Sequence, residues 1–334
     1  MAAKPTLKSI AQSLGLHHSL ISRVLRGTAD VRVSPEKRRL ILQTAHEVGY
    51  RPNRMGSSLR SQASQVVALL TPDITNPFHS RLFSGAEKAA RLAGYDLLLC
   101  HVSDHRDSTD LADAVTRGLV DGVLVACAWQ PDPRLALLRE AQLPYVLINR
   151  PSGDPQELQF LPDDEATGLL AAQALAERGH QRILAIFSDM RMGSMRRRCD
   201  AFVRHLHALA PRTELTIRDN MNSAAALRQV IADMAGNAIL QRPTAVFVPH
   251  SQYTAIVVEE VSIRHGLRVP QEVSILGYGA EPASALSAVC VPAETMGAEG
   301  MEALLRLIRG EPAGPSKAYA PVLNAGLTLG PPGG

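Results

Sequence analysis

Short apolar runs alternate with amphipathic segments of helical length from Val66 onward. This alternation is typical of parallel strands joined by crossover helices. A first series predicts strands at 66–70, 96–100, 122–126 and 145–149, with helices near 78–93, 107–118 and 132–141. A second series predicts strands at 182–187, 244–248 and 273–277, with helices near 164–178, 194–209, 223–235 and 252–265. Two such series predict two α/β lobes, with a ligand cleft at the carboxyl ends of the strands.

The first 50 residues have a helical pattern instead. Ala11, Gly15 and Ile21 have the spacing of a helix-turn-helix, with a small residue at the helix contact, a glycine in the turn and a branched apolar residue in the second helix. Ser34-Pro35-Glu36 predicts the start of a third helix, which Gly49 ends. The expected buried stripe of this helix consists of Leu40, Ile41, Ala45 and Val48. By itself, the pattern is equally compatible with an ordinary helical hairpin.

Charge is divided unevenly along the chain. Residues 1–64 contain eleven Lys and Arg against three acids, a net charge of about +8, whereas the whole chain carries only +3. A basic head on a near-neutral body indicates a polyanionic partner for the head. No apolar run reaches the roughly 18 to 20 residues that span a bilayer, and the N-terminus lacks the apolar stretch of a signal peptide. We therefore expect a cytoplasmic protein that does not enter a membrane.

Motifs for catalysis and metal binding are missing from the sequence. It contains no GxxxxGK[ST], HExxH or GxSxG motif, and no GxGxxG after a strand. The four cysteines are far apart, which predicts reduced, buried thiols: Cys100, Cys127, Cys199 and Cys290. The pair Asp163-Asp164 is interpreted as a helix start, where carboxylates favour the positive end of the dipole. We expect neither an enzyme nor a bound metal or cofactor.

Three segments resemble the lac repressor and Gal repressor family of bacterial transcription regulators. They are TLKSIAQSLGLHHSLISRVLRG, VSPEKRRLILQTAHEVGYRPNR and VVALLTPDITNPFHSRLFSGAEKAARLAGYDLLLC. The resemblance extends from Thr6 to about Arg309. It implies a small all-α helix-turn-helix DNA-binding head and a two-lobed α/β body with parallel sheets. That body would be similar to periplasmic binding proteins, would bind an effector and would dimerise.

The resemblance also implies where the domains divide. The helix-turn-helix head would occupy 1–52, a hinge helix and linker 53–64, and the body 65–334. Within the body, lobe 1 would comprise 65–162 and 292–321, and lobe 2 would comprise 163–291 and 322–334.

In this family the second helix of the head lies in the major groove, with its N-terminal residues at the base edges. A recognition helix from about His17 to Arg26 would therefore place His18, Ser19 and Arg23 at the bases. Arg23 is the candidate for a bidentate contact to guanine, with a phosphate contact as the alternative. The other DNA-binding candidates are Thr6, His17, Ser22, Arg26, Asn53, Arg54, Gly56, Leu59 and Arg60.

Two positions of this helix depart from the family pattern. The family commonly has Ser or Thr as the N-cap and a Thr three residues later, where this chain has His17 and Leu20. Both changes make the operator sequence hard to predict. The adjacent His17 and His18 do not form a metal pair, because neighbouring helical residues do not face each other and no further ligand is near.

The segment at 53–64 resembles the hinge helix of the family. Asn53 would cap it, and Leu59 would be the apolar wedge in the minor groove, with packing against protein as the alternative. Gly56-Ser57-Ser58 forms a helix poorly, so we expect the hinge to fold only on double-stranded DNA. Two adjacent hinges require a homodimer on a pseudo-palindromic operator, and the lack of a heptad run after Gly310 favours a dimer over a tetramer.

Members of the family close their lobes around a small molecule, usually a sugar or a nucleobase. The effector-binding candidates by position are Phe78, His79, Trp129, Arg150, Phe160, Arg198, His250 and Gly279. Phe78 and Phe160 could equally belong to the core. The run Arg196-Arg197-Arg198 could equally be a solvated helix start, of which only Arg198 is carried as a ligand candidate.

Two departures in the cleft change the expected ligand. His250-Ser251 stands where the family usually has Asn-Asp, and Gly279 stands where it has Asp. Loss of these acceptors, with Arg150 and Arg198 retained, predicts an anionic effector such as a sugar acid or another small carboxylate. The segments PAETMG and GLTL resemble the gluconate-type regulators. The alternative is a cleft that has lost effector binding.

Together these features predict an effector-responsive, DNA-binding transcription regulator, as a rule a repressor. A two-lobed solute-binding receptor is a different class, which the basic head and the missing signal peptide disfavour. A constitutive DNA-binding protein whose body only dimerises is a third class, which a ligand-induced thermal shift would distinguish from the first.

Overall fold

The computed structural model describes residues 5–25, 31–50, 63–102, 117–279 and 284–333. The chain divides into two compact units, Met1–Ser64 and Gln65–Gly334. The helix expected near 107–118 and most of the expected hinge lie outside the described residues.

The described part of the first unit contains α1 (Leu7–Leu14), α2 (His18–Leu25) and α3 (Pro35–Glu47). A reciprocal capping box starts α1, because the Thr6 hydroxyl accepts from the Ser9 amide at 3.1 Å and the Ser9 hydroxyl accepts from the Thr6 amide at 2.9 Å. Gly15 ends α1 in the left-handed conformation, with φ of 63°. The helices enclose a small core made of Ile10, Ala11, Ile21, Val24, Val31, Ile41 and Ala45.

The stripe expected on α3 is only half correct. Ile41 and Ala45 are buried, but Leu40 and Val48 have exposed fractions of 49% and 45%. Ile41 and Ala45 lie one turn apart on the same face of the helix, whereas Leu40 lies roughly a quarter turn away. The start of α3 agrees with its sequence, since the Ser34 hydroxyl caps it and Pro35 is its first residue.

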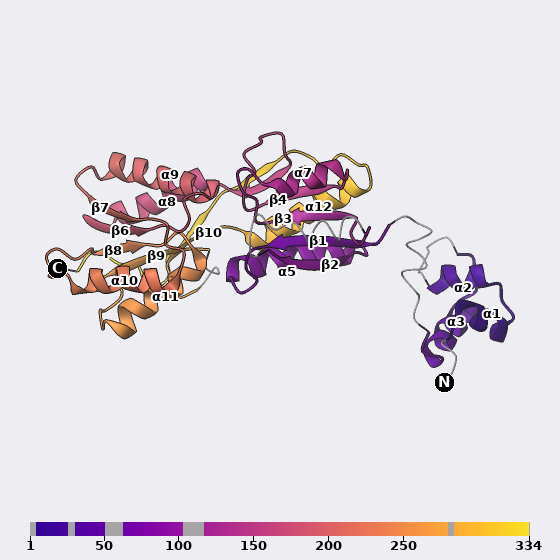
Figure 1. Ribbon diagram of the computed structural model, residues 1–334. Coiled ribbons are helices and arrows are strands. Elements are labelled where there is room, and N and C mark those ends of the chain that lie inside the picture. The colour runs from indigo at the N-terminus through magenta and orange to yellow at the C-terminus, as the bar shows by residue number, and fades with distance from the viewer. Residues whose placement is uncertain (1–4, 26–30, 51–62, 103–116, 280–283, 334) are drawn as a thin grey trace. The chain divides into compact units, whose positions relative to one another are not determined.

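The second unit contains two six-stranded sheets, which define two lobes (Figure 1). Lobe 1 has the strand order β11-β5-β4-β3-β1-β2, and lobe 2 has the order β12-β10-β9-β8-β6-β7. The lobe 1 strands are β1 (Val66–Thr71), β2 (Asp96–His101), β3 (Gly122–Val125), β4 (Tyr145–Ile148), β5 (Gln159–Pro162) and β11 (Lys317–Tyr319). The lobe 2 strands are β6 (Arg182–Ile186), β7 (Glu214–Arg218), β8 (Ala245–Phe247), β9 (Ser274–Tyr278), β10 (Ala288–Cys290) and β12 (Val322–Asn324). The pairings are parallel except β10 with β12.

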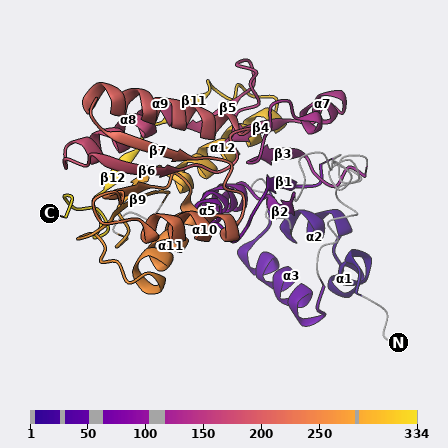
Figure 2. The same ribbon diagram turned by 60° about the vertical axis from the view of Figure 1, so that its left-hand side comes forward.

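Helices cover both faces of each sheet, as the views in Figures 1 and 2 agree. The lobe 1 helices are α5 (Pro77–Leu92), α7 (Pro133–Glu140) and α12 (Ala293–Ile308). The lobe 2 helices are α8 (Asp164–Ala176), α9 (Gly193–Leu209), α10 (Ala224–Gly236) and α11 (Ser251–Glu259), which the π-helical turn η1 (Glu260–Arg264) continues. In lobe 2, alternate residues of β6 pack under α8 and α9 or under α10 and α11. The pattern therefore predicted the buried strands well, because strands covered on both faces are continuously apolar.

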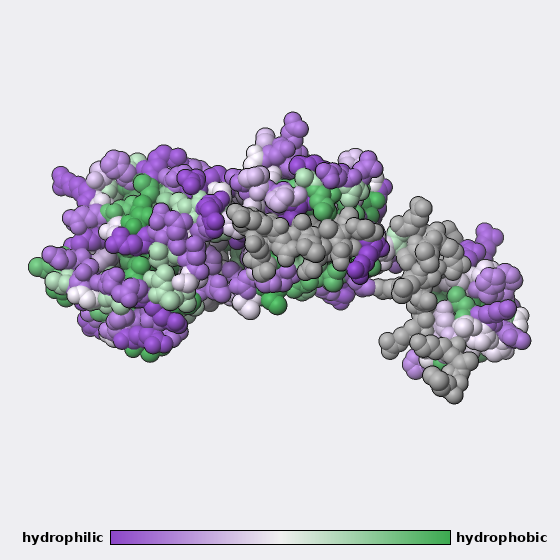
Figure 3. All heavy atoms as spheres, in the orientation of Figure 1, coloured by the Kyte–Doolittle hydropathy of each residue, from purple (hydrophilic) through white to green (hydrophobic). Residues whose placement is uncertain are grey.

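Strands β5, β7 and β10 were not predicted. They have only three to five residues each, and β7 is largely exposed, so their apolar signal is weak. The chain passes between the two sheets after β5, after β10 and after β11. None of the described helices is long and apolar enough to cross a membrane. The face drawn in Figure 3 is mainly hydrophilic, with small hydrophobic patches.

Candidate functional site

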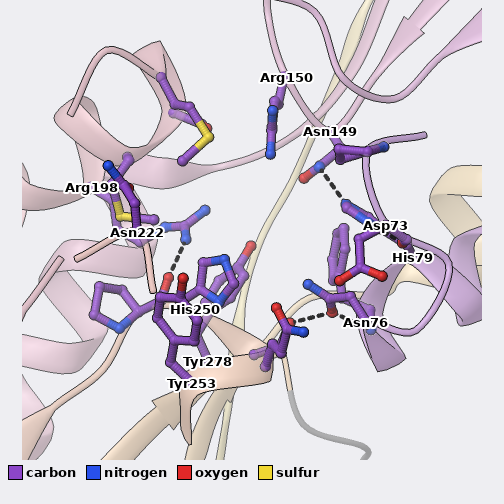
Figure 4. Close-up of a pocket in the computed structure, with 18 residues that line it drawn as sticks. Asp73, Asn76, His79, Asn149, Arg150, Arg198, Asn222, His250, Tyr253 and Tyr278 are labelled. Carbon is purple, nitrogen blue, oxygen red and sulfur yellow. Dashed lines mark hydrogen bonds between the residues drawn. The ribbon is translucent and has the colours of Figure 1, made fainter. Parts of the chain in front are cut away.

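A cavity of about 380 Å³ lies between the two lobes, at the carboxyl ends of their strands. This volume is in the range of about 300 to 1,000 Å³ that small-molecule sites occupy. Lobe 1 contributes the segment after β1 and the two residues after β4, and lobe 2 contributes the start of α9, the segment before α11 and the end of β9. Figure 4 shows side chains from both lobes facing this space. The labelled residues are Asp73, Asn76, His79, Asn149, Arg150, Arg198, Asn222, His250, Tyr253 and Tyr278.

The cation of the lobe 2 wall is fixed by protein groups. Arg198, which is 5% exposed, donates to Asp164 Oδ1 at 2.8 Å and to the Pro249 carbonyl at 2.9 Å. Its guanidinium lies 3.8 Å from the ring centroid of Tyr278, close enough for a cation–π interaction. The second oxygen of Asp164 accepts from Arg197 at 2.8 Å. The charge of Arg198 is therefore compensated before any ligand arrives.

The cation of the lobe 1 wall is held differently. Arg150 follows β4 and points into the cavity (Figure 4). Its guanidinium lies 5.8 Å from the ring centroid of Trp129. Among the described residues, no carboxylate lies within 4.0 Å of it. Burial lowers the pKa of Arg150, but a guanidinium remains protonated in proteins. The acid whose charge acts on Arg150, Asp189, binds Arg191 through both oxygens.

Each wall also presents one uncharged imidazole. The His79 ring donates from Nδ1 to the Asp73 carbonyl at 2.9 Å, and burial lowers its pKa to about 4. The His250 ring stacks on Tyr253 at a centroid distance of 4.3 Å. Burial and the nearby arginines lower the pKa of His250 to about 3. Both rings are therefore neutral at physiological pH and serve as hydrogen-bonding groups.

The two lobes touch on both sides of the cavity. The Ser251 hydroxyl donates to Asn76 Oδ1 at 2.6 Å, and Asn76 also caps α5 by accepting from the Phe78 amide at 3.0 Å. On the other side, the Trp129 ring of lobe 1 lies 5.7 Å from the Arg191 guanidinium of lobe 2. Contacts between the lobes therefore border the cleft, which remains partly open.

Five of the eight effector candidates line the cavity: Phe78, His79, Arg150, Arg198 and His250. The other three are not among its lining residues. Trp129 lies beside the cavity, between the guanidiniums of Arg150 and Arg191. Phe160 is a core residue of β5, only 5% exposed, because the unpredicted strand turns its ring inward.

Gly279 is not among the lining residues, and its backbone and close neighbours disfavour a side chain there. Its φ is 69°, and a Cβ there would lie 3.1 Å from Ser251 Cβ and 3.5 Å from the Phe78 ring. Its carbonyl accepts a hydrogen bond from Arg81 across the lobes. An aspartate at this position would be strained, which gives a physical reason for the departure from the family pattern.

Several polar lining residues were not predicted from the sequence, notably Asn76, Asn149 and Tyr278. Asn76 and Asn149 follow the ends of β1 and β4, and Tyr278 ends β9. The rule that ligands bind at the carboxyl ends of parallel strands could have found all three. The ion pair of Asp164 with Arg198 was also missed, because Asp164 was interpreted only as part of a helix start.

Of the described DNA-binding candidates, Thr6 caps α1 and His17 directly precedes α2. His18 and Ser19 lie in the first turn of α2, and Ser22 and Arg23 lie in its last turn. His17, His18, Ser19 and Arg23 are exposed, and Ser22 is half-buried. The remaining candidates lie outside the described residues: Arg26, Asn53, Arg54, Gly56, Leu59 and Arg60.

His17 takes over the capping role of the usual Ser or Thr. Its Nδ1 accepts from the Ser19 amide at 3.4 Å and lies 2.8 Å from the Ser19 hydroxyl, while its carbonyl accepts from the Leu20 amide at 3.0 Å. A neutral imidazole can supply this acceptor. Leu20 is partly buried against the core of the head. The two departures from the family pattern are therefore compatible with an intact α2.

Comparison with known proteins gives relatives that match almost the whole chain. Residues 172–327 match the periplasmic binding protein-like domain family. The transcriptional regulator DegA of Bacillus subtilis is 27% identical over 95% of this chain and 96% of its own length. The transcriptional regulator CelR of Thermobifida fusca is 28% identical over 92% of this chain and 93% of its own.

Solved structures agree in fold. A complex of the regulator CelR with cellobiose has a TM-score of 0.65 and 27% identity over 96% of this chain and 100% of that chain. A lac repressor dimer bound to operator and an anti-inducer has a TM-score of 0.78 and 19% identity over 97% of this chain and 99% of that chain. These relatives are transcriptional regulators rather than enzymes. The three-helix head, the two-lobed α/β body and these matches make the chain similar, over nearly its whole length, to transcriptional regulators of the lac repressor and Gal repressor family.

Proposed function

We propose that the protein represses transcription as a homodimer, and that a small carboxylate bound between lobes 1 and 2 changes its affinity for operator DNA. In this proposal residues 1–52 read the operator, 53–64 form the hinge and 65–334 bind the effector and dimerise. The protein would act in the bacterial cytoplasm on genes for uptake or breakdown of its effector. The relatives include a regulator solved with cellobiose and a repressor solved on its operator, which supports the two activities in outline.

The observation that carries the DNA-binding part is the exposed side of α2. His18, Ser19 and Arg23 are accessible there, on a core that Ile21 and Val24 anchor from the opposite face. A helix that is anchored on one face and exposes polar side chains on the other is what a major-groove reader requires. The net charge of about +8 on residues 1–64 supplies the attraction to phosphates.

The proposed effector class follows from two features of the cleft, the loss of acceptor side chains and the presence of arginines. His250 and Gly279 stand where family members have hydrogen-bond-accepting side chains, and Arg150 adds a cation to the wall. A neutral sugar would find few carboxylate acceptors among the described lining residues, where Asp73 is the sole acid. A carboxylate ligand would instead gain charge-assisted hydrogen bonds.

The test is selection of bound genomic fragments by the purified protein at near-physiological salt, followed by footprinting. We expect a pseudo-palindrome of about 14 to 20 base pairs, as two-fold symmetric heads require. Arg23→Ala should relax base preference, at a cost of roughly 1 to 3 kcal/mol for the lost base contact. Arg54→Ala should instead weaken binding to every sequence and flatten its salt dependence. Equal, uniform losses in both variants would show that Arg23 does not read a base.

A further inference from the structure

Two cations face the cavity from opposite walls, and only one has an acid. Arg198 shares Asp164 with Arg197, and the Asp164 side chain is 1% exposed. Among the described residues Arg150 has no ion pair, and its one ring contact is the Trp129 face. The cleft therefore holds one compensated and one uncompensated positive charge.

Leaving a half-buried guanidinium without an acid costs free energy. The acid whose charge acts on Arg150, Asp189, and the acid that lines the cavity, Asp73, are already engaged. Asp189 binds Arg191 at 2.9 and 3.0 Å through Nε, and Asp73 accepts from the Thr75 amide and hydroxyl at 2.7 Å. The ring of Trp129 offers only a weak substitute for a carboxylate. An anion brought by a ligand would remove this cost.

The polar atoms of the lobe 2 wall favour uncharged ligand groups. Three of its buried polar atoms have no hydrogen-bond partner within the described structure: Arg198 Nε, His250 Nδ1 and Tyr278 Oη. Buried polar atoms are normally paired, so these three indicate where a ligand would bind. Because Arg198 is already neutralised and His250 is uncharged, groups that donate and accept without carrying charge fit them best. Hydroxyl groups have that property.

We infer that the cleft selects a monoanionic hydroxy acid, whose single carboxylate binds Arg150 of lobe 1 and whose hydroxyl groups bind Arg198, His250 and Tyr278 of lobe 2. This inference rests on the proposed function, because it assumes that the cleft is the effector site. The ligand spans the cavity from one wall to the other and thereby links the lobes. A neutral polyol leaves Arg150 uncompensated, and a second carboxylate places a charge against a wall whose cation already has its acid.

The experiment is calorimetric titration of the full-length protein, without DNA, using three compounds with the same carbon chain. Glucitol is neutral, gluconate carries one carboxylate and glucarate carries two; galactitol, galactonate and galactarate form a second such set. Within the set that binds, we expect the monocarboxylate to bind at least tenfold more tightly than either relative. Preference for the neutral or the doubly charged member, or no binding of either monocarboxylate at millimolar concentration, would overturn the inference.

Two arginines on the same tryptophan provide matched variants. Arg150→Met should weaken monocarboxylate binding by roughly 10- to 100-fold, the value of a charge-assisted hydrogen bond. The double variant Arg191→Met/Asp189→Asn removes the paired guanidinium near the same ring together with its acid, so no carboxylate is freed for Arg150, and it should change the affinity less than threefold. Equal losses in the two variants would assign the effect to Trp129 and contradict a carboxylate site at Arg150.

Different results would refute the proposed regulatory function and the proposed charge selection of the cleft. Tight, Arg150-dependent binding of a monocarboxylate that leaves operator affinity unchanged would refute the regulatory coupling and sustain the charge selection. Specific operator binding without any carboxylate binding would refute the charge selection and sustain the DNA-binding function.

Discussion

The two walls of the cleft each present one arginine, and the chain surrounds them differently. On lobe 2, Arg198 is held by Asp164, the Pro249 carbonyl and the Tyr278 ring. On lobe 1, Arg150 lies against Trp129 without an acid in the described structure. A charge that the protein itself compensates can stabilise the fold, and here it joins α8, α9 and the segment before α11. A charge that it leaves uncompensated can be satisfied by a ligand.

The largest expected effect is on stability, and it comes from removing the acid of the lobe 2 arginine, so that both walls present an arginine without an acid. Asp164→Asn removes the acid from Arg198 and Arg197, and breaking a buried ion pair in this way costs about 3 to 5 kcal/mol. Urea unfolding should show a correspondingly lower midpoint. If the variant remains folded, its second uncompensated cation should raise the affinity for glucarate relative to gluconate.

The matched control for this variant is Glu165→Gln. Glu165 is the next residue of α8, but its side chain is 58% exposed and its partners Arg204 and His205 lie at the surface. Exposed pairs contribute about 0 to 1 kcal/mol, so the control should unfold almost as the unmodified protein does. Similar losses in both variants would mean that Asp164 is not specially important to the lobe 2 wall.

The second effect is the pH dependence of stability, which arises from the neutral imidazole that each wall presents. The pKa of His79 is lowered to about 4 in the folded protein, whereas an exposed histidine has a pKa near 6.5. Between these values the unfolded chain binds a proton that the folded protein does not, so stability is lost as the pH falls from about 6.5 to about 4. The loss attributable to His79 is about 3 kcal/mol. His79→Asn should make the free energy of unfolding depend less steeply on pH in this window, and an unchanged slope would assign the acid sensitivity to other groups.

The third effect compares the arginines directly by their contribution to stability. Arg198→Met leaves Asp164 with Arg197 alone and removes two hydrogen bonds, so we expect a loss of about 2 to 3 kcal/mol. Arg150→Met removes a half-buried cation without an acid and should leave the free energy of unfolding unchanged or raise it slightly. Chemical denaturation of both variants at pH 7 measures the difference. The comparison fails if Arg150→Met is the more destabilising of the two.

Much of this arrangement follows from local sequence. The Ser34 cap and the turn at Gly15 depend on residues within a few positions of one another. The same holds for the strands that are apolar on both faces of a sheet. Such features were predictable, as was the cluster of Phe78, His79, Arg150, Arg198 and His250 once the resemblance had given the cleft.

What could not be predicted depends on residues far apart in the chain. Asp164 and Arg198 are 34 positions apart, and only the packing of α8 on α9 brings their charges together. The same holds for Phe160, whose short strand pairs with β11 more than 150 residues later and buries its ring. No local pattern shows that Arg150 lacks an acid, because that property belongs to the whole wall.

The smallest expected effect tests whether the walls act together. Ser251→Ala removes the 2.6 Å hydrogen bond to Asn76 that joins the lobes, while Asn76 keeps its cap on α5. A hydrogen bond of this kind contributes about 0.5 to 1.5 kcal/mol, so monocarboxylate binding should weaken by roughly two- to tenfold. Ser262→Ala removes a hydroxyl that bonds only within its own helix, to the Val258 carbonyl, and should leave ligand affinity unchanged. If the Ser251 variant binds the ligand as tightly as the Ser262 variant does, closure of the lobes does not depend on this contact. A loss of affinity in the Ser251 variant alone would mean instead that the ligand binds a state in which the Ser251–Asn76 hydrogen bond already joins the lobes. The ligand would then contact the uncompensated charge of lobe 1 and the polar wall of lobe 2 at the same time.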